Sequence, residues 1–345
     1  MNKFKFWLNN ARTVALPQSV MPAIMALCII GSQSSWGGFW QFGQGYFSLP
    51  LAIIALIGIV CAHLSVNLFD DYFDYKNAGI ESREKLNRAG MRARIGKALY
   101  LAEGKATLAE TRRVASLFGL VAIVAGGAIL YFRGLPIIIL AACGGFLGFF
   151  YSAKPFMFCY RGMGELVTGI IFGPLLMLGM GQAAAGIFDP GLGLISVAVA
   201  LLVINILYTH SIMDAAPDES VGKKTLATIL HTPTKMLAGS FVFNFFPYAF
   251  VVLAVVLGWV SPWVLVSFVT LPMAVSLFKL MIDYCEENAK GLPPAQTKIK
   301  WWMGPMSNWD GIVAAGIDWF MIRWFLARNM LTYLVLLISI GAFIN

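Results

Sequence analysis

The composition of this 345-residue chain excludes a soluble globular protein. Hydrophobic residues make up 59% of it and charged residues only 12%, against roughly 45–50% and about 25% in a typical soluble domain. With 25 basic and 17 acidic side chains, we expect lipid to surround most of the chain. Disorder and a disulfide-stapled secreted fold are excluded as well, and the five cysteines show no CxxC spacing.

Nine apolar stretches are long enough to cross a bilayer as helices, which takes about 17–25 residues. We therefore expect an all-α, polytopic membrane protein with nine transmembrane helices around a central cavity. Pro136 and Pro262 mark helix starts, where a missing N–H group costs nothing. The stretches cover residues 13–32, 48–69, 114–132, 135–153, 164–185, 192–213, 236–258, 262–283 and 326–344.

The Lys and Arg residues predict the orientation, because cytoplasmic loops carry an excess of them. With the N-terminus in the cytoplasm, Arg133 alone among the 25 basic residues falls on the other side. The net charge of +8 is then a topology signal, and no nucleic-acid partner is indicated. We expect a multi-pass protein of the cell inner (plasma) membrane, with its C-terminus outside.

Two intervals between the stretches are longer than a connection requires. Residues 75–113 and 284–325 are expected to be extended cytoplasmic loops of a single transmembrane domain that covers residues 1–345. The second interval is rich in tryptophan, which suggests a segment in the headgroup region or an aromatic belt beside the last helix. Its tryptophans are Trp301, Trp302, Trp309, Trp319 and Trp324.

Acidic residues cluster at the end of the second stretch, in HLSVNLFDDYFDYK. Four polar side chains there are spaced i, i+3, i+4 and i+7, which places them on one face of one helix. They are Asn67, Asp70, Asp71 and Asp74. Three carboxylates this close repel one another and are costly to desolvate near a membrane, so we expect a cation to neutralise them. Oxygen ligands without a thiolate pattern favour Mg²⁺ over zinc or copper.

A second acidic cluster ends the sixth stretch on the same side, in HSIMDAAPDESVGKKTL. Asp214 and Asp218 lie four residues apart with Pro217 between them, so we expect the helix to break or kink there. A glycine and then Lys223 and Lys224 follow. The two clusters can face each other across a cavity, where two Mg²⁺ ions would hold a diphosphate and the lysines would add charge-assisted contacts.

Each cluster also has a simpler interpretation as a solvated helix end. That interpretation would suffice for one cluster alone. We favour a binding site because two matched clusters end different helices on one side, and few other acids lie near the apolar stretches.

The two motifs together resemble those of the UbiA superfamily of intramembrane prenyltransferases, and within it the 1,4-dihydroxy-2-naphthoate prenyltransferases of menaquinone synthesis. NLFDDYFDYK resembles the family's first aspartate motif and DAAPDESVGKKTL resembles the second. Between them, YSAKPFMFCYRGMGELVTGIIFGP is similar to the family's middle signature, with a G-x-G-E stretch over 162–165 and Phe-Gly-Pro over 172–174. The resemblance covers most of residues 10–285, and the family implies nine helices across the membrane.

The sequence departs from the family pattern in three places. The first motif usually has Asn where Asp70 stands, and its later acid is matched only loosely by Glu81. Before the second motif, naphthoate-type members tend to carry Asn-Asn-x-Arg-Asp, where this chain has His-Ser-Ile-Met-Asp ending at Asp214. The missing Asn and Arg residues before the second motif bear on the acceptor more than on the diphosphate chemistry.

The resemblance implies a Mg²⁺-dependent enzyme that transfers a polyprenyl group from polyprenyl diphosphate to a small aromatic acceptor and releases diphosphate. Asp71 and Asp74 would hold one Mg²⁺ ion as catalytic residues. Asp214 and Asp218 would hold the other. Further substrate-binding residues would be auxiliary ligands (Asn67, Asp70), countercharges to the leaving diphosphate (Lys76, Arg161, Lys223, Lys224) and a ring face for the allylic cation (Tyr151). The implied partners are the two substrates and the bilayer, with no obligate protein partner.

Several neighbouring side chains have both a functional and a structural interpretation. His63 and His210 each precede a polar motif residue by four positions, as supports for the ligands or as hydrogen-bonded core histidines. Glu165 would position a loop or contact the acceptor. Four aromatic residues would offer ring faces to the cation or simply pack: Tyr72, Phe73, Tyr151 and Tyr160.

Two alternatives remain open from the sequence. An ion-coupled transporter would also carry polar residues within its helices, although here the acids lie at one rim and no inverted repeat is evident. Within the superfamily, the acceptor would instead be 4-hydroxybenzoate, haem, a chlorophyllide, a lipid glycerol or a sugar phosphate.

Overall fold

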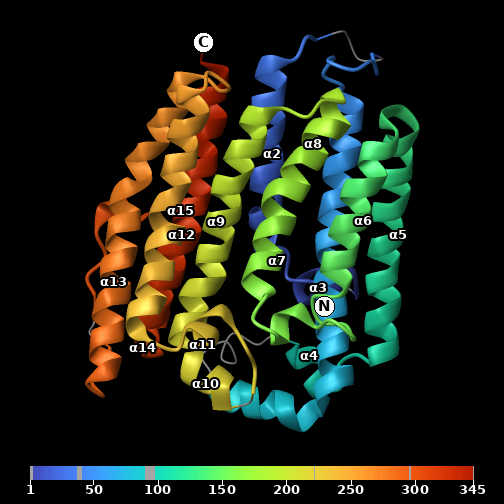
Figure 1. Ribbon diagram of the computed structural model, residues 1–345. Coiled ribbons are helices and arrows are strands. Elements are labelled where there is room, and N and C mark those ends of the chain that lie inside the picture. Colours follow the sequence, from blue (N-terminus) through green and yellow to red (C-terminus); the bar gives the residue numbers. More distant parts are fainter. Residues whose placement is uncertain (1–2, 37–40, 90–97, 221, 295–296, 345) are drawn as a thin grey trace.

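The computed structural model describes residues 3–36, 41–89, 98–220, 222–294 and 297–344, with side chains described outside 78–89. Glu81, the loose match for a later acid of the first motif, therefore lies outside the described side chains. The described chain is almost entirely helical and forms one bundle of roughly parallel and antiparallel helices (Figure 1). The predicted all-α membrane fold is confirmed.

Within the part of the chain that the structure describes, eight helical segments are long and apolar enough to cross a membrane. They are Thr13–Gln33, Leu49–Asn77, Leu108–Arg133, Gly164–Ala185, Pro190–Met213, Pro233–Val256, Pro262–Ala289 and Asp318–Phe343. The remaining predicted stretch forms the apolar helix α6 (Leu135–Phe149), which has 15 residues and is shorter than a usual membrane span. All nine stretches are helical, while nine crossings and a cytoplasmic N-terminus stay predictions.

The long helices begin where the sequence supplies start signals. Proline lies in the first turn of α2 (Pro17–Gln33), α6, α9 (Pro190–Met213) and α12 (Pro233–Val256). Side-chain caps add to this signal, because Asp189 accepts a hydrogen bond from the backbone N–H of Leu192 at the start of α9. α5 (Leu108–Arg133) begins with a capping box between Thr107 and Glu110, so it starts before the predicted residue 114.

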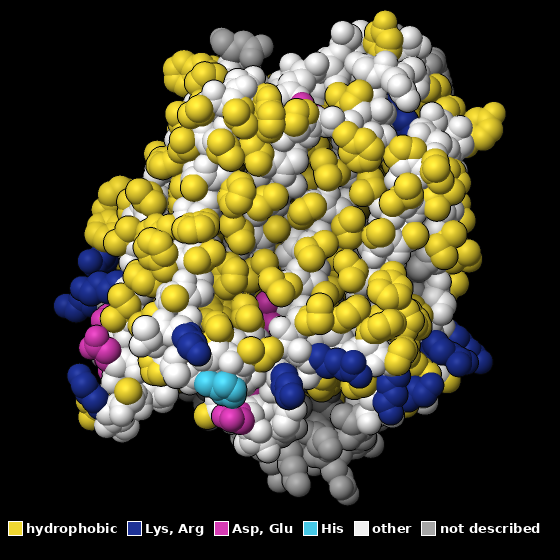
Figure 2. Space-filling model, viewed as in Figure 1, with side chains coloured by type: hydrophobic (Ala, Val, Ile, Leu, Met, Phe, Trp, Pro, Cys, Tyr) yellow, Lys and Arg dark blue, Asp and Glu magenta, His cyan; other side chains and the backbone are white. Residues whose placement is uncertain are grey.

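α9 lies at the centre of the bundle. It packs against α2, α12, α15 (Asp318–Phe343), and the α7–α8 segment (Gly164–Ile170 and Leu176–Ala185). Figure 1 shows α5 and α6 at one side of the bundle and α13 (Leu271–Ala289) at the other. Hydrophobic side chains cover the middle of the visible face, and most of its Lys and Arg side chains gather at the end that carries α10 (Ala215–Ser220) and α11 (Leu226–Leu230) (Figure 2).

Two glycines allow the α7–α8 segment to approach α9 closely. A Cβ atom on Gly173 would lie 2.5 Å from the carbonyl oxygen of Ser196, and one on Gly169 would lie 2.9 Å from that of Ala200. Pro174 follows within a short π-helical turn, η4 (Ile171–Leu175), which relieves the missing N–H group. The Phe-Gly-Pro stretch of the sequence is thus a packing and bending element.

The predicted break between Asp214 and Asp218 is present. α9 ends at Met213, and α10 starts at Ala215. Pro217 cannot donate the hydrogen bond that the carbonyl of Met213 would receive in a continuous helix. The hydroxyl of Tyr284 on α13 donates to that carbonyl instead, at 3.1 Å. The break therefore turns the chain without leaving this backbone acceptor unsatisfied.

The two intervals expected as extended loops contain much helix. α3 (Leu49–Ala89) continues well past the predicted end at residue 69, and α4 (Leu99–Ala102) follows. In the second interval, α13 runs to Ala289, α14 (Trp309–Ala314) follows, and α15 begins at Asp318, before the predicted residue 326. Trp301 is 90% exposed, whereas the indole N–H of Trp302 donates to the hydroxyl of Ser276 at 3.0 Å. That these intervals form cytoplasmic extensions stays a prediction.

Candidate functional site

The two acidic motifs lie at the same end of the bundle. The first lies on α3, and the second starts at the end of α9 and continues into α10. α10 contacts α3, so the motifs are brought together although they are far apart in the sequence (Figure 1). Two loops complete this region, residues 150–163 before α7 and residues 222–225 before α11.

The carboxylates of the first motif share one buried face of α3, as the spacing predicts. Asp71 and Asp74 are 0% and 2% exposed, and Asp70 is 7% exposed. Tyr72 and Phe73 point elsewhere and pack with each other at a ring distance of 5.1 Å. Burial of three acids without a compensating cation would be strongly unfavourable, so their partners decide what the site can do.

Arg12 is the described cation that neutralises the first motif. Its Nη2 atom forms ion pairs with Asp70, at 3.2 Å, and with Asp71. Burial alone would lower the pKa of Arg12, but the charges of Asp71 and Asp70 raise it above its ordinary value, so the guanidinium stays charged. Its backbone is left-handed, with φ of 61°, which costs a non-glycine residue roughly 1–2 kcal/mol. The ion pairs and the packing of the N-terminal segment offset that cost.

Asp70 and Asn67 are held by other parts of the chain. The hydroxyl of Ser152, in the loop before α7, donates to Oδ1 of Asp70. The side-chain amide of Asn67 donates to the carbonyl of Ala11 at 2.9 Å. Asn67 therefore fixes the turn that carries Arg12, and Asp70 ties α3 to the loop. Their predicted role as auxiliary ligands stays a prediction.

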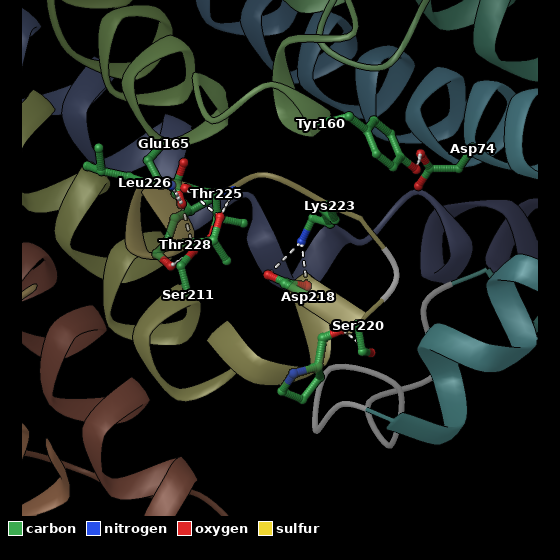
Figure 3. A network of polar contacts seen from close by, with 12 residues as sticks. Asp74, Tyr160, Glu165, Ser211, Asp218, Ser220, Lys223, Thr225, Leu226 and Thr228 are labelled. Atoms are coloured by element: carbon green, nitrogen blue, oxygen red, sulfur yellow. Dashed lines mark hydrogen bonds and ion pairs between the residues drawn. The ribbon is translucent and has the colours of Figure 1, made fainter. Parts of the chain in front are cut away.

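Asp74 is held by Tyr160. The phenolic hydroxyl donates to Oδ1 of Asp74 at 2.6 Å, which is in the range of a charge-assisted hydrogen bond (Figure 3). Tyr160 was expected either to face the allylic cation or to pack. Its hydroxyl instead orients one of the predicted metal ligands.

The second motif carries its own cation. Nζ of Lys223 lies 3.0 Å and 3.1 Å from the two carboxylate oxygens of Asp218 (Figure 3). Asp214 caps the end of α9, and its carbonyl accepts the backbone N–H of Asp218 at 2.9 Å. Asp214 and Asp218 are both buried. Lys223 therefore pairs with Asp218 in the structure, and its predicted contact with a diphosphate stays a prediction.

A short backbone bridge joins the two loops of the site. The N–H of Gly162 donates to the carbonyl of Lys224 at 2.9 Å, and the N–H of Lys224 donates to the carbonyl of Tyr160 at 3.3 Å. Gly162 has a φ of +78°, which favours glycine over any other residue. These two hydrogen bonds therefore hold both Tyr160, which orients Asp74, and Lys224, which is next to Lys223.

Glu165 links three elements behind the acidic motifs. Its Oε1 atom accepts hydrogen bonds from the hydroxyl of Ser211, at 2.6 Å, and from the backbone N–H of Leu226, at 3.3 Å (Figure 3). Thr225 and Thr228 cap α11 beside it. The interpretation of Glu165 as a residue that positions a loop fits these contacts, because it connects α7, the end of α9 and the start of α11.

The remaining predicted substrate-binding residues lie in the same region, and Lys76 and Lys224 belong to the two sequence motifs themselves. Lys76 is exposed, with Nζ 5.5 Å from the ring centre of Tyr72. Arg161 is exposed and donates to the carbonyl of Pro155 at 2.9 Å. Tyr151 is half-buried and accepts the backbone N–H of Cys159 through its carbonyl. Lys224 contributes the backbone bridge described above.

The two histidines near the motifs are core residues. Nδ1 of His63 shares a hydrogen bond of 2.7 Å with the hydroxyl of Ser19, and both side chains are buried. The ring of His210 lies against the rings of Phe320 and Trp324, at 5.4 Å and 5.8 Å. These contacts favour the core interpretation of both residues over a role as support for the ligands.

The donor atoms of the two motifs fit Mg²⁺. They are carboxylate oxygens, which this ion prefers, and the ion is commonly bound by one or two carboxylates together with substrate phosphates. Among the residues that the structure describes, no three His, Cys, Asp or Glu side chains group into a metal site by themselves. The arrangement therefore suits ions that are shared with an anionic ligand and not a closed structural metal centre.

Three residues of the site have no counterpart in the sequence-based prediction. Arg12 was assigned only to the cytoplasmic end, and Ser152 was not singled out. The position of Arg12, immediately before the first apolar stretch, was an available signal because that rim also carries the acids. Tyr100 is a third, since burial and the neighbouring charge of Asp71 raise its pKa above the usual value.

Comparison with known proteins identifies relatives across most of the chain. The 1,4-dihydroxy-2-naphthoate octaprenyltransferase of Bacillus subtilis is 28% identical over 233 residues, which cover 67% of this chain and 71% of that protein. A structure of digeranylgeranylglyceryl phosphate synthase matches the fold with a TM-score of 0.60 at 14% identity, over 99% of both chains. A UbiA homolog from Archaeoglobus fulgidus, bound to GPP and Mg²⁺, matches with a TM-score of 0.52 at 15% identity, over 96% of this chain and 99% of that one.

The family assignment rests on a match to more than half of the chain. The model of the UbiA prenyltransferase family matches residues 32–302, which include both acidic motifs and the middle signature. The structural neighbours share the helical bundle of this chain. The chain therefore belongs to the UbiA prenyltransferase family.

Proposed function

We propose that this prenyltransferase transfers a polyprenyl group from polyprenyl diphosphate to a 1,4-dihydroxy-2-naphthoate-like aromatic acceptor, with Mg²⁺ and with release of diphosphate. The observation that carries the proposal is the meeting of two buried acidic motifs at one end of the bundle, where α10 contacts α3. Acids in such a place suit a ligand that arrives with cations, because an anionic diphosphate alone would be repelled by them.

The carboxylates would divide into two pairs. Asp71 and Asp74 would hold one Mg²⁺ ion, and Asp214 and Asp218 the other. When bound, these ions would neutralise the diphosphate and so favour its departure from the allylic carbon.

The basic side chains would contact the same diphosphate. Lys223 is held against Asp218, and from there its ammonium group would contact the diphosphate. Lys224, Arg161 and Lys76 lie on the surrounding loops and at the end of the α3 face, where they would add charge-assisted contacts. Burial of the motifs excludes water from the region in which the allylic cation forms, which protects the cation from capture as an alcohol.

The ring that attacks the cation would be a naphthoate. Support comes from the Bacillus subtilis relative, whose function is 1,4-dihydroxy-2-naphthoate octaprenyl transfer. The likeness to digeranylgeranylglyceryl phosphate synthase supports the fold alone. Tyr151 would face the cation from the loop before α7. No observation favours an ion-coupled transporter.

The chain is a multi-pass membrane protein by its apolar helices and its family. We place the active site on the cytoplasmic face of the inner membrane. The proposal is supported by the gathering of Lys and Arg side chains at the end of the bundle that carries the acidic motifs (Figure 2).

The test is an assay of the purified full chain in lipid nanodiscs, with radiolabelled geranylgeranyl diphosphate and a panel of acceptors. We expect a prenylated naphthoate product with Mg²⁺ and none with EDTA, together with release of inorganic diphosphate. The 4-hydroxybenzoate, haem and lipid-glycerol arms should remain at background.

Two outcomes would contradict the proposal. Turnover that persists in EDTA would show that the reaction does not need Mg²⁺. Product formed only with a non-naphthoate acceptor would show that the proposed acceptor is wrong. Mass spectrometry of quinones in cells with and without the gene gives an independent readout of the same acceptor.

A further inference from the structure

We infer that Asp70 holds Arg12 as a built-in counter-ion, so that a metal ion can take Asp71 while the guanidinium keeps a carboxylate partner. The inference rests on the proposed function, because it concerns the Mg²⁺ ion assigned above to Asp71 and Asp74. Asp70 is then a positioning residue that acts through Arg12, and not an auxiliary metal ligand.

The geometry shows a guanidinium shared between two carboxylates. Nη1 and Nη2 of Arg12 lie 3.3 Å and 3.2 Å from Oδ2 of Asp70, and Nη2 also pairs with Oδ1 of Asp71. Both ends of the fork reach Asp70, whereas one nitrogen reaches Asp71. The contact with Asp70 can therefore persist when Asp71 is engaged elsewhere.

Asp70 is itself fixed for this role. Its other oxygen, Oδ1, accepts the hydroxyl of Ser152, so the two oxygens serve two different partners. An asparagine at this position would present an N–H group to one of them, either to the guanidinium or to the hydroxyl. Only a carboxylate accepts from both sides at once.

Arg12 has little freedom to move away. Its backbone is in the left-handed region, the carbonyl of Ala11 is bound by Asn67, and Nη2 donates to the carbonyl of Asn67 at 3.3 Å. The guanidinium is thus tethered above the first motif by α3 itself. When a metal ion binds Asp71, a guanidinium held in this way remains near the ion and needs another carboxylate partner.

These contacts predict how the loss of Asp70 and the loss of Arg12 would each change the affinity for a metal ion. A metal ion at Asp71 repels the guanidinium, and that repulsion is smaller when the guanidinium remains paired with Asp70. Without Asp70, Asp71 is the remaining described carboxylate for Arg12, so arginine and metal compete for it. Without Arg12, there is no competitor and the role of Asp70 disappears.

The experiment is a double-mutant cycle on metal binding itself. The full chain in nanodiscs is titrated with Mn²⁺ as a spectroscopic substitute for Mg²⁺, and free Mn²⁺ is measured by electron paramagnetic resonance. The proteins are wild type, Asp70→Asn, Arg12→Gln and the double variant. Asp310→Asn, on the exposed α14, and Lys105→Gln, in an exposed ion pair with Glu103, are the matched charge controls.

We expect Asp70→Asn to raise the Mn²⁺ dissociation constant about fivefold, the scale of a partly exposed ion pair. Arg12→Gln should lower it. In the Arg12→Gln background, Asp70→Asn should change it less than about twofold, because coupled residues are not additive. Arg12→Lys keeps a cation at this position and serves if Arg12→Gln does not fold. In the Arg12→Lys background, Asp70→Asn should again raise the Mn²⁺ dissociation constant.

An equal loss of affinity from Asp70→Asn with and without the cation at position 12 would overturn the inference, because Asp70 would then act on the metal directly. Weaker Mn²⁺ binding in Arg12→Gln would overturn it as well. A wild type that binds no Mn²⁺ and turns over in EDTA would overturn the proposed function and this inference with it. Wild-type binding with a failed cycle overturns the inference alone.

Discussion

Removal of one hydroxyl group from Tyr160 tests whether Asp74 must be held in place for catalysis. Tyr160→Phe keeps the ring and deletes the 2.6 Å hydrogen bond to Oδ1 of Asp74. A hydrogen bond to a charged group contributes roughly 1.5–3 kcal/mol, and the half-buried Tyr160 allows water to replace part of it, which leaves about 1–2 kcal/mol. At 1.36 kcal/mol per tenfold, kcat/KM should fall by about five- to thirtyfold.

The assay measures kcat/KM for the prenyl donor and the Mg²⁺ concentration that gives half-maximal turnover, in nanodiscs. Both should worsen in Tyr160→Phe, because a looser Asp74 is a poorer ligand. Tyr131→Phe is the control, since Tyr131 is 84% exposed and lies at the end of α5 away from the acidic motifs. If Tyr160→Phe keeps wild-type kcat/KM and the same Mg²⁺ midpoint while Asp74→Asn does not, the reasoning about orientation is wrong.

Three further predictions follow from the site, the loop bridge and the topology. Asp71→Asn, Asp74→Asn, Asp214→Asn and Asp218→Asn should each lower turnover by roughly tenfold or more without loss of folded protein, and near-normal turnover in any two would refute the metal assignment. Gly162→Ala should lower the free energy of unfolding by about 1–2 kcal/mol, because φ is +78° there, and a thermal melt at unchanged Tm would contradict this. A C-terminal alkaline phosphatase fusion should be active outside the inner membrane, whereas an inactive fusion would mean an even number of crossings.

The sequence predicts the helices well because apolar length is a strong signal in a membrane protein. The stretch 164–185 is helical over its full predicted range, even though a π-helical turn at Pro174 interrupts its regularity. The ends of polar segments were harder to place. The predicted end of this helix was residue 69, because hydropathy falls at the acids that follow. The helix α3 continues beyond that residue because no proline interrupts it before Ala89.

The candidate site was predictable where its residues lie close together in the sequence. The shared face of the first motif follows from helical spacing, and the pairing of Asp218 with Lys223 lies within six residues of sequence. The partners of Asp70, Asp71 and Asp74 come from residues 12, 152 and 160, and no local pattern says which of many basic or hydroxyl side chains will reach them. Such long-range pairings depend on how the helices pack.

The backbone bridge between Gly162 and Lys224 joins the loop whose Tyr160 holds Asp74 of the first motif to a loop of the second motif. Two hydrogen bonds of this kind act as a mechanical linkage, because a displacement of one loop stretches bonds that also anchor the other. A movement of either loop would therefore move the other loop as well, unless these two hydrogen bonds break first. Tyr160, which holds Asp74, and Lys223, which pairs with Asp218, are thereby coupled to each other through the backbone.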